Sequence, residues 1–161
     1  MPTHNADKAD VSLHEITAST VRAVTDLRVA PEQEGYVASN AVSIAQAYFH
    51  REAWFRCIHA ADVLIGFVML RDATLLTPAP KPAQLSLWRF MVDHRYQRVG
   101  FGRRALELVV AHAHTRPGID SIQTSYVVGP HGPMEFYLSF GFRHTGEIKP
   151  NGEVVIVLEL A

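Results

Sequence analysis

A strand that passes through a glycine-bearing turn directly into a helix constrains this chain more than any other segment. Residues 85–92 are rich in aromatic and apolar side chains, as a buried strand requires. Apolar residues then recur at helical spacing over residues 102–114. Gly100 and Gly102 lie between the two and allow close backbone approaches that a Cβ would block. The segment therefore predicts a strand, a tight turn and a helix whose first turn is open to close contact.

The start of this helix predicts an anion-binding site. The first N–H groups of a helix have no partner inside it, and the helix dipole adds roughly half a positive charge at that end. Arg98, Arg103 and Arg104 place full charges beside it. Three like charges at a helix N-terminus disfavour the helix unless an anion neutralises them, and a pyrophosphate is an anion that helix N-termini bind well.

Two other interpretations stay open on these residues alone. In the first, the glycines only shape a turn and the arginines are solvated. In the second, Gly100-x-Gly102-x-x-Ala105 is a dinucleotide-binding pattern of the form G-x-G-x-x-G/A. That pattern normally belongs to the first strand and helix of a larger repeated domain, whereas only about a third of this chain follows it. A nicotinamide-binding fold therefore does not fit.

Periodicity along the rest of the chain predicts a mixed α/β sheet with helices on both faces. The expected strands are residues 11–16, 54–60, 63–70, 85–92, 121–128 and 154–160, with a further strand before the Pro150-Asn151-Gly152 turn. The expected helices are a short one through Val21, Val24 and Leu27, then residues 39–49, 102–114 and 133–140. Thr17, Ser19 and Thr20 offer hydroxyls that could cap the first helix.

Composition is that of one compact domain. The 161 residues are 48% hydrophobic, so we expect a single domain over residues 1–161, with polar residues 1–10 flexible. Lys and Arg number 15 against 16 for Asp and Glu, so neither nucleic acid nor a membrane surface is an expected partner. The single cysteine, Cys57, excludes an internal disulfide, and no secretion signal or membrane-spanning stretch is visible. We therefore expect a cytoplasmic location.

Two motifs resemble those of the Gcn5-related N-acetyltransferase (GNAT) superfamily. Gln97-Arg98-Val99-Gly100-Phe101-Gly102 matches the family pattern Q/R-x-x-G-x-G/A. About forty residues later, Phe136-Tyr137-Leu138-Ser139-Phe140-Gly141-Phe142 matches the pattern Y-x-x-x-G-F. Both motifs in this order are far more specific than either alone. The resemblance covers nearly the whole chain, and within the family the sequence looks most like bacterial spermine/spermidine and related diamine acetyltransferases.

The resemblance implies a single-domain GNAT-like α/β fold with a mixed, mostly antiparallel sheet, and acetyl-CoA as cosubstrate. The backbone amides that would bind its pyrophosphate are those of Gln97, Arg98, Val99, Gly100, Phe101, Gly102 and Arg103. Along its pantetheine arm would lie the backbone groups of Phe90, Met91 and Val92. Many family members carry an asparagine about seven residues before the tyrosine, where this chain has Pro130. The side-chain contact that this asparagine makes to the cofactor is then lost here or replaced by one from His131.

Acyl transfer also needs a proton donor, a polarised thioester and a neutral amine. Tyr137 is the candidate acid for the departing sulfur, and a strand amide near Met91 or Val92 is the candidate for polarising the thioester. The candidate bases are Asp93, Glu32 and Glu34, although each could also be solvated surface. Glu32 and Glu34 could instead bind a cationic polyamine.

The expected function is transfer of the acetyl group to a primary amine of a small molecule, with a polyamine or diamine favoured. Aminoglycosides and protein amines are alternatives within the same reaction. A non-catalytic acyl-CoA-binding or sensing module is an alternative of another class, against which Tyr137 argues. No metal is expected, because His112 and His114 face different directions on a helix and no Cys/His cluster has ligand spacing. Dimers are common in the family, so a homodimer is possible.

Overall fold

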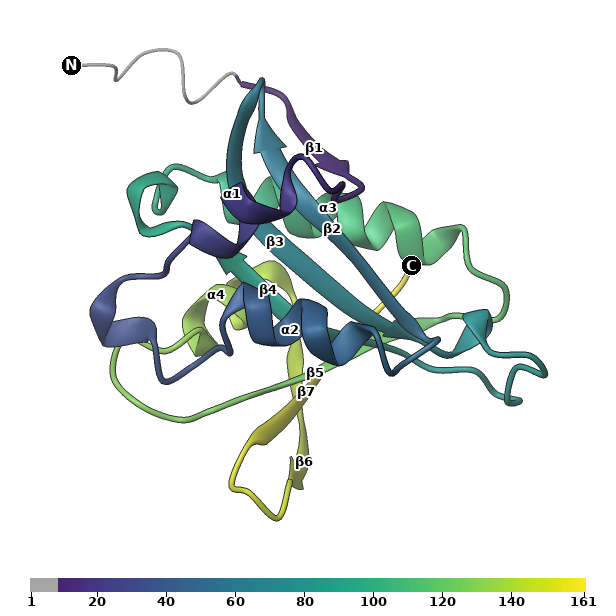
Figure 1. Cartoon of the computed structure of the whole chain (residues 1–161). Helices are drawn as coiled ribbons and strands as arrows, with labels where there is room; N and C mark the ends of the chain where they lie inside the picture. The colour runs from purple at the N-terminus through teal and green to yellow at the C-terminus, as the bar shows by residue number, and fades with distance from the viewer. Residues whose placement is uncertain (1–8) are drawn as a thin grey trace.

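The computed structural model describes residues 9–161 and contains a seven-stranded sheet in the order β1-β2-β3-β4-β5-β7-β6 (Figure 1). The strands are β1 (Val11–His14), β2 (Ala53–Ala60), β3 (Val63–Asp72), β4 (Leu85–Val92), β5 (Ser121–Tyr126), β6 (Arg143–Ile148) and β7 (Val154–Glu159). Among the strands of residues 9–161, only β4 and β5 pair in parallel, and the other neighbours are antiparallel. The predicted mixed, mostly antiparallel sheet is confirmed. Most of the segment predicted to be flexible, residues 1–8, lies outside the described residues.

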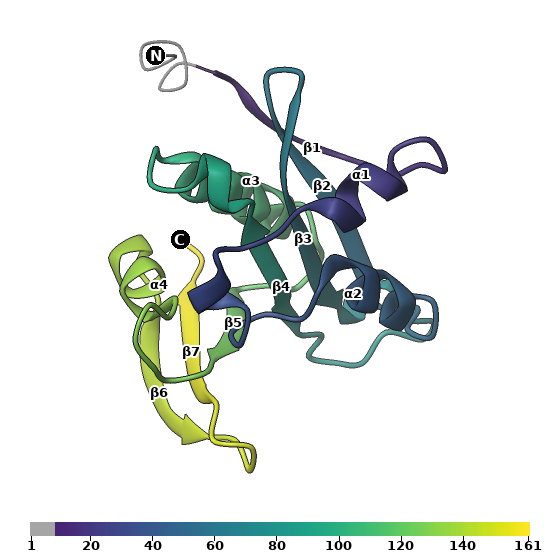
Figure 2. The same ribbon diagram turned by 60° about the vertical axis from the view of Figure 1, so that its left-hand side comes forward.

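Helices cover both faces of the sheet, as predicted (Figures 1 and 2). On one face lie α1 (Val21–Asp26) and α2 (Asn40–Ala47), and on the other lie α3 (Phe101–His114) and α4 (Met134–Phe140). The described part of the chain also contains three short 3-10 turns that were not predicted: η2 (Pro31–Gln33), η3 (Ala73–Leu75) and η4 (His94–Tyr96). No helix within residues 9–161 is long and apolar enough to cross a membrane.

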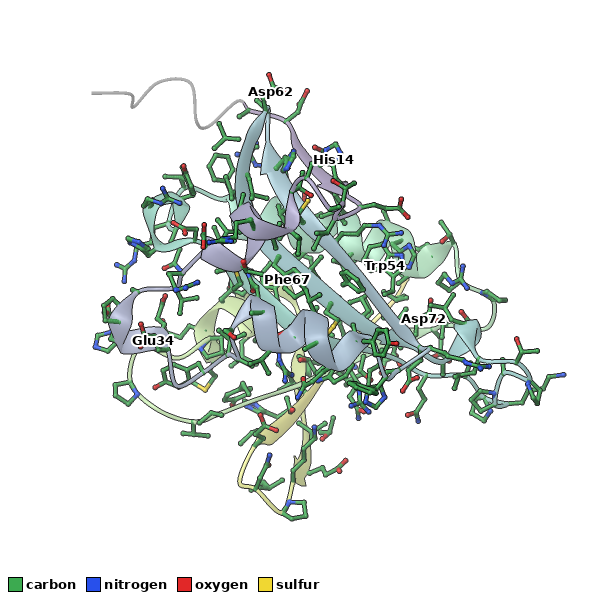
Figure 3. The ribbon with its side chains drawn as sticks, in the orientation of Figure 1. His14, Glu34, Trp54, Asp62, Phe67 and Asp72 are labelled. Atoms are coloured by element: carbon green, nitrogen blue, oxygen red, sulfur yellow. The ribbon has the colours of Figure 1, made fainter. Side chains whose placement is uncertain are left out.

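Alternation of side chains along β3 supplies a hydrophobic core to each face. Phe67 and Met69 are fully buried with Val24 on the side of α1 and α2, where Figure 3 shows Phe67. Val68 and Leu70 are fully buried with Leu106 and other residues of α3. Successive strand residues point to opposite faces, so one central strand anchors both helical layers.

The hydroxyls before α1 do not cap it, in contrast to the prediction. Thr20 Oγ1 instead accepts a hydrogen bond from the backbone N–H of Thr17 at 2.9 Å. Thr17 Oγ1 in turn bonds the hydroxyls of Ser19 and Thr20. The three side chains therefore form hydrogen bonds within their own turn. The strand before this turn, β1, ends at His14, two residues earlier than expected. By contrast, Ser39 caps α2 by accepting from the N–H of Val42 at 3.2 Å.

The sheet opens between β4 and β5. The two strands pair at a single position, Ser86 opposite Gln123. One side-chain bond, from Thr124 Oγ1 to the carbonyl of Leu87 at 2.8 Å, extends the contact by one residue. On its β5 edge, the remainder of β4 therefore faces a gap, while its other edge stays paired with β3.

A β-bulge in β4 changes which side chains face which helices. Arg89 pairs with Met69 and Leu87 pairs with Leu70, so Trp88 is an extra residue without a partner on β3. Before the bulge, Leu87 belongs to the core beneath α3, whereas after it Met91 belongs to the core beneath α1 and α2. The bulge therefore inverts the alternation along β4, so that odd-numbered residues face α3 before it and face α1 and α2 after it. Bulges next to active sites often redirect side chains in this way.

Candidate active site

A cavity of about 1080 Å³ occupies the gap where β4 and β5 diverge, and we call it the β4–β5 cavity. Its walls come from β4, β5, the start of α3, α4, the loop around η2 and the β6–β7 hairpin. The volume lies slightly above the usual range for small-molecule sites, which is about 300–1,000 Å³. An extended ligand can therefore enter between the two strands.

The start of α3 forms one end of the cavity. Gly100 has φ of 89°, a left-handed conformation that glycine adopts without strain, and it turns the chain into the helix. The first helical hydrogen bond runs from Arg104 N–H to the Gly100 carbonyl at 3.2 Å. The amides of Phe101, Gly102 and Arg103 precede that bond and have no acceptor within the helix. They form a set of donors suited to an anion.

The predicted anion-binding residues divide into those that line the cavity and those that do not. The lining includes Gln97, Arg98, Gly100, Gly102 and Arg103. Val99 and Phe101 do not line the cavity, and the side chain of Phe101 is buried in the core beneath α3. Of the three arginines, Arg104 donates to the carbonyl of Ala9 at 2.6 Å and does not line the cavity.

Gln97 fixes the loop around η2 to the end of β4. Its side-chain amide donates to the carbonyl of Val92 at 2.8 Å and to Gln33 Oε1 at 2.9 Å. Gln33 Oε1 also accepts from the N–H of Ala30 at 3.2 Å. The first residue of the glycine motif therefore positions a cavity wall through its side chain, a role that the sequence pattern did not indicate.

Asp93 does not face the cavity, which argues against the candidate base suggested by its place after β4. Its side chain is buried, and its carboxylate accepts hydrogen bonds from the N–H of Arg28 at 2.9 Å and the N–H of Arg95 at 3.0 Å. The Arg95 guanidinium adds a bond at 2.8 Å. Burial alone raises the pKa of Asp93, but these hydrogen bonds outweigh it and the pKa is lowered. Asp93 thus holds the turn after β4 to the chain after α1.

Tyr137 lines the cavity from α4 and is only 7% exposed. Its ring packs between Phe136 and Phe142, with ring centroids 5.5 and 5.3 Å away. Burial raises the pKa of the Tyr137 phenol, so the hydroxyl is protonated at neutral pH. Within residues 9–161 this hydroxyl has no hydrogen-bond partner. It is therefore a free proton donor at the cavity wall.

Tyr36 and the loop between β5 and α4 close one side of the cavity. The Tyr36 hydroxyl donates to the carbonyl of Pro130, the residue that stands where many family members carry asparagine. Gly129 lies so close to the Tyr36 hydroxyl that a Cβ there would collide with it. His131 lines the cavity next to this contact. The loop thus packs directly on the segment between η2 and α2.

Of the two glutamates predicted to bind the acceptor, Glu34 lines the cavity and Glu32 does not. Figure 3 shows Glu34 on the loop after η2, far from Asp72 at the end of β3. Sequence reasoning missed other charged residues of the lining, namely Arg71, Arg89, Lys149 and Glu153. Arg71 could have been placed on the same side of β3 as Met69, because residues two apart on a strand point to the same face.

Other residues considered from the sequence have structural surroundings. Cys57 is 1% exposed, and burial raises the pKa of its thiol, as expected for a core residue. Trp54 stacks on His112 at 4.1 Å, whereas Trp88 lines the cavity. Among residues 9–161, no group of three His, Cys, Asp or Glu side chains could hold a metal ion.

Comparison with known proteins agrees with this architecture. Spermine/spermidine N(1)-acetyltransferase of Bacillus subtilis is 27% identical over 153 residues, which are 93% of this chain and 99% of that protein. Aminoglycoside acetyltransferase AAC(6′)-Ib in complex with coenzyme A is 14% identical with a TM-score of 0.73, over 93% of this chain and 95% of that one. Arabidopsis thaliana Naa50 in complex with a bisubstrate analogue is 18% identical with a TM-score of 0.65. That match covers 92% of this chain and 98% of the Naa50 chain.

The sequence also matches the model of the acetyltransferase (GNAT) family over residues 21–142, which is most of the chain. That match, with the cavity between diverging strands and the open amides at the start of α3, leads to one conclusion: the chain belongs to the acetyltransferase (GNAT) family and is an acetyl-CoA-dependent N-acetyltransferase.

Proposed function

We propose that this enzyme transfers the acetyl group of acetyl-CoA directly to a primary amine of a small molecule in the β4–β5 cavity. The single observation that best supports this is that Tyr137 lines the same cavity as Gly102 and Arg103, whose amides precede the first hydrogen bond of α3. An anion-binding end and a proton donor are both needed for a CoA thioester to react there. A sensing module would need only the first.

The residues at the start of α3 fit the pyrophosphate of acetyl-CoA. Amide donors of Gly102 and Arg103 precede the first helical bond, and Arg98 and Arg103 add positive charge. Without a side chain, Gly102 exposes its backbone amide, and a Cβ there would lie in van der Waals contact with the Phe136 ring at 3.5 Å. The backbone of β4 near Met91 and Val92 would hold the acyl arm along the open strand edge. Bound there, acetyl-CoA supplies the activated acyl group.

The transfer forms a C–N bond, breaks the C–S bond and moves one proton from nitrogen to sulfur. We assign to Tyr137 the delivery of a proton to the sulfur, because its hydroxyl is protonated and unpartnered. We assign to Glu34 the removal of the amine proton through water, since it faces the cavity and forms no ion pair within residues 9–161. Glu153 is less suited, because its carboxylate already accepts from Asn151 at 3.0 Å.

Polyamines or diamines are one candidate class of acceptor. They are supported by the name of the Bacillus subtilis relative and by the two carboxylates of the lining, Glu34 and Glu153. The prediction that Glu32 also contributes lacks support, because Glu32 lies outside the lining.

The proposal is tested by incubating the protein with acetyl-CoA and a panel of small primary amines, and by detecting the acetylated amine by mass spectrometry. At least one amine should yield a product in proportion to the CoA released. If CoA binds but no amine is acetylated, the acyl-CoA-binding module becomes the better interpretation.

A further inference from the structure

The part of the β4–β5 cavity away from α3 carries an unexpected group of positive charges. Arg71 on β3, Arg89 on β4 and Lys149 before β7 all belong to its lining. We call these three residues the basic group. The β-bulge at Trp88 helps to assemble it, because Arg89 then reaches α2, where it donates to Gln46 Oε1 at 3.0 Å. The same Trp88 ring lies under the guanidinium of Arg71, with 4.0 Å from Cζ to the ring centroid.

The protein only partly neutralises the basic group. Lys149 lies 3.9 Å from Glu153, but neither Arg71 nor Arg89 forms a salt bridge within residues 9–161. Glu52 adds a longer-range attraction to Arg71, while its carboxylate accepts a hydrogen bond from His50 Nδ1 at 3.1 Å. Two guanidinium groups thus stand in a cavity without a carboxylate in direct contact.

Arg89 has unused hydrogen-bonding capacity. Its Nη1 donates to the carbonyl of Trp88 at 3.1 Å, but its buried Nε has no acceptor within the described residues. Burial lowers the pKa of the Arg89 guanidinium, and the charge of Arg71 lowers it further, against a partial offset from Glu153. Nη1 and Nη2 each donate to one protein acceptor, the Trp88 carbonyl and Gln46 Oε1, so each keeps a second hydrogen that a ligand oxygen could accept.

The basic group does not serve the pyrophosphate. Arg89 lies three residues before Val92, the last residue of β4, which is roughly 10 Å along an extended strand. The amides at the start of α3 lie beyond Val92, so they are farther still from Arg89. Arg71 lies opposite Ser86, further still from the α3 end. Once Arg98 and Arg103 are assigned to the pyrophosphate, three cations remain against Glu34 and Glu153. A polycation would meet uncompensated repulsion there.

We propose that the acceptor amine carries an anionic oxygen group, a carboxylate or a phosphate, which binds to Arg89 and Arg71 while its amine faces the acyl donor. Arginine forks bind such groups through two parallel hydrogen bonds. Lys149 and Glu153 border the same space and contribute to orientation. This inference rests on the proposed function and competes with a polyamine acceptor.

The test uses acceptors that differ by one anionic group. Lysine is 1,5-diaminopentane with a carboxylate added, and O-phosphoethanolamine is ethanolamine with a phosphate added. Spermidine represents the polycations. Initial rates of acetylated product give kcat/KM for each. The anionic member of at least one pair should be favoured by about 10- to 100-fold, as charge-assisted hydrogen bonds imply. The favoured pair identifies carboxylate or phosphate.

Two variants locate the site. Arg89→Gln and Arg71→Gln should each reduce the preference within the favoured pair, measured as the ratio of the two kcat/KM values, by about tenfold or more. The matched control is Arg22→Gln, on the exposed surface of α1. CoA affinity and melting temperature, measured beside the rates, show whether each variant is folded. The ratio in the wild-type enzyme tests the inference even if a variant is not.

The possible outcomes separate the inference from the proposed function. A preference for spermidine or 1,5-diaminopentane, or equal rates within both pairs, would overturn the anionic acceptor and leave amine acetylation intact. A preference that persists unchanged in folded Arg89→Gln and Arg71→Gln would overturn the assigned site. CoA binding without acetylation of any amine would overturn the proposed function and this inference with it.

Discussion

Replacement of Tyr137 by phenylalanine removes the single hydroxyl to which proton delivery is assigned. General acid catalysis contributes about 10²- to 10⁴-fold in rate, so kcat should fall by at least about 100-fold. A phenol with an ordinary pKa of about 10 protonates a thiolate of pKa about 8.5 at a cost of roughly 2 kcal/mol. Burial raises the pKa of Tyr137 and increases that cost. The hydroxyl therefore acts by hydrogen bonding to sulfur as its charge develops.

The same substitution should leave the fold intact. The Tyr137 ring packs against Phe136 and Phe142, and phenylalanine retains those contacts. The lost hydroxyl has no protein partner within residues 9–161, so no buried group is left unsatisfied. A change of 1 kcal/mol shifts the melting temperature of a chain this size by about 2–4 °C, and we expect a shift no larger than that.

The assay measures kcat with the best amine, the dissociation constant for CoA and the melting temperature in both proteins. The reasoning requires a large loss of kcat with nearly unchanged CoA affinity and stability. A folded Tyr137→Phe enzyme with wild-type kcat would show that water or another group protonates the sulfur.

Three further predictions follow from the surroundings of the cavity. Asp93→Asn should destabilise the protein by about 1.5–3 kcal/mol at neutral pH, because hydrogen bonds to a charged carboxylate are weakened. Since the folded pKa of Asp93 is lowered, this difference should diminish below about pH 4, and denaturant melts at pH 7 and pH 3 check it. Glu34→Gln should lower kcat/KM for the best amine by about tenfold or more, as loss of a base implies, whereas Glu32→Gln should change it little. If the two substitutions lowered kcat/KM equally in steady-state assays, Glu34 would act only as a surface charge and not as the base. Gly129→Ala should displace Tyr36 and raise the amine KM while calorimetry finds CoA affinity unchanged, and an unaltered KM would separate this loop from acceptor binding.

The elements nearest the glycine motif were predicted most accurately from the sequence. The strand over residues 85–92 has the predicted bounds, and α3 starts within one residue of its expected position. Local signals determine both, since a strand pattern and a helical pattern meet at a glycine turn. The opening of the sheet beside β4 could not be predicted, because it depends on which residues of β5 pair with it.

Residues whose role depends on distant partners were predicted poorly. Asp93 resembled a free carboxylate after a strand, but its acceptor capacity is used by Arg28, which lies 65 residues away in sequence. Arg89 is visible in the strand pattern, yet the bulge that redirects it exists only in the pairing with β3. Lys149 and Glu153 reach the cavity through the β6–β7 hairpin, whose position no local pattern specifies. The single domain, the cytoplasmic location and the homodimer stay predictions.

Calorimetric titration of CoA into wild-type, Gly102→Ala and Gly102→Asp proteins tests the central claim most directly. A Cβ on residue 102 would make ordinary van der Waals contacts, 3.5 Å from the Phe136 ring and 3.8 Å from Val92 Cγ2, so both variants should fold. A carboxylate 4 Å from a phosphate charge costs about 4 kcal/mol at an effective dielectric constant of about 20. Gly102→Asp should therefore weaken CoA binding by at least about 100-fold, and Gly102→Ala by much less. Wild-type affinity for CoA in a folded Gly102→Asp protein would contradict a pyrophosphate site at the start of α3.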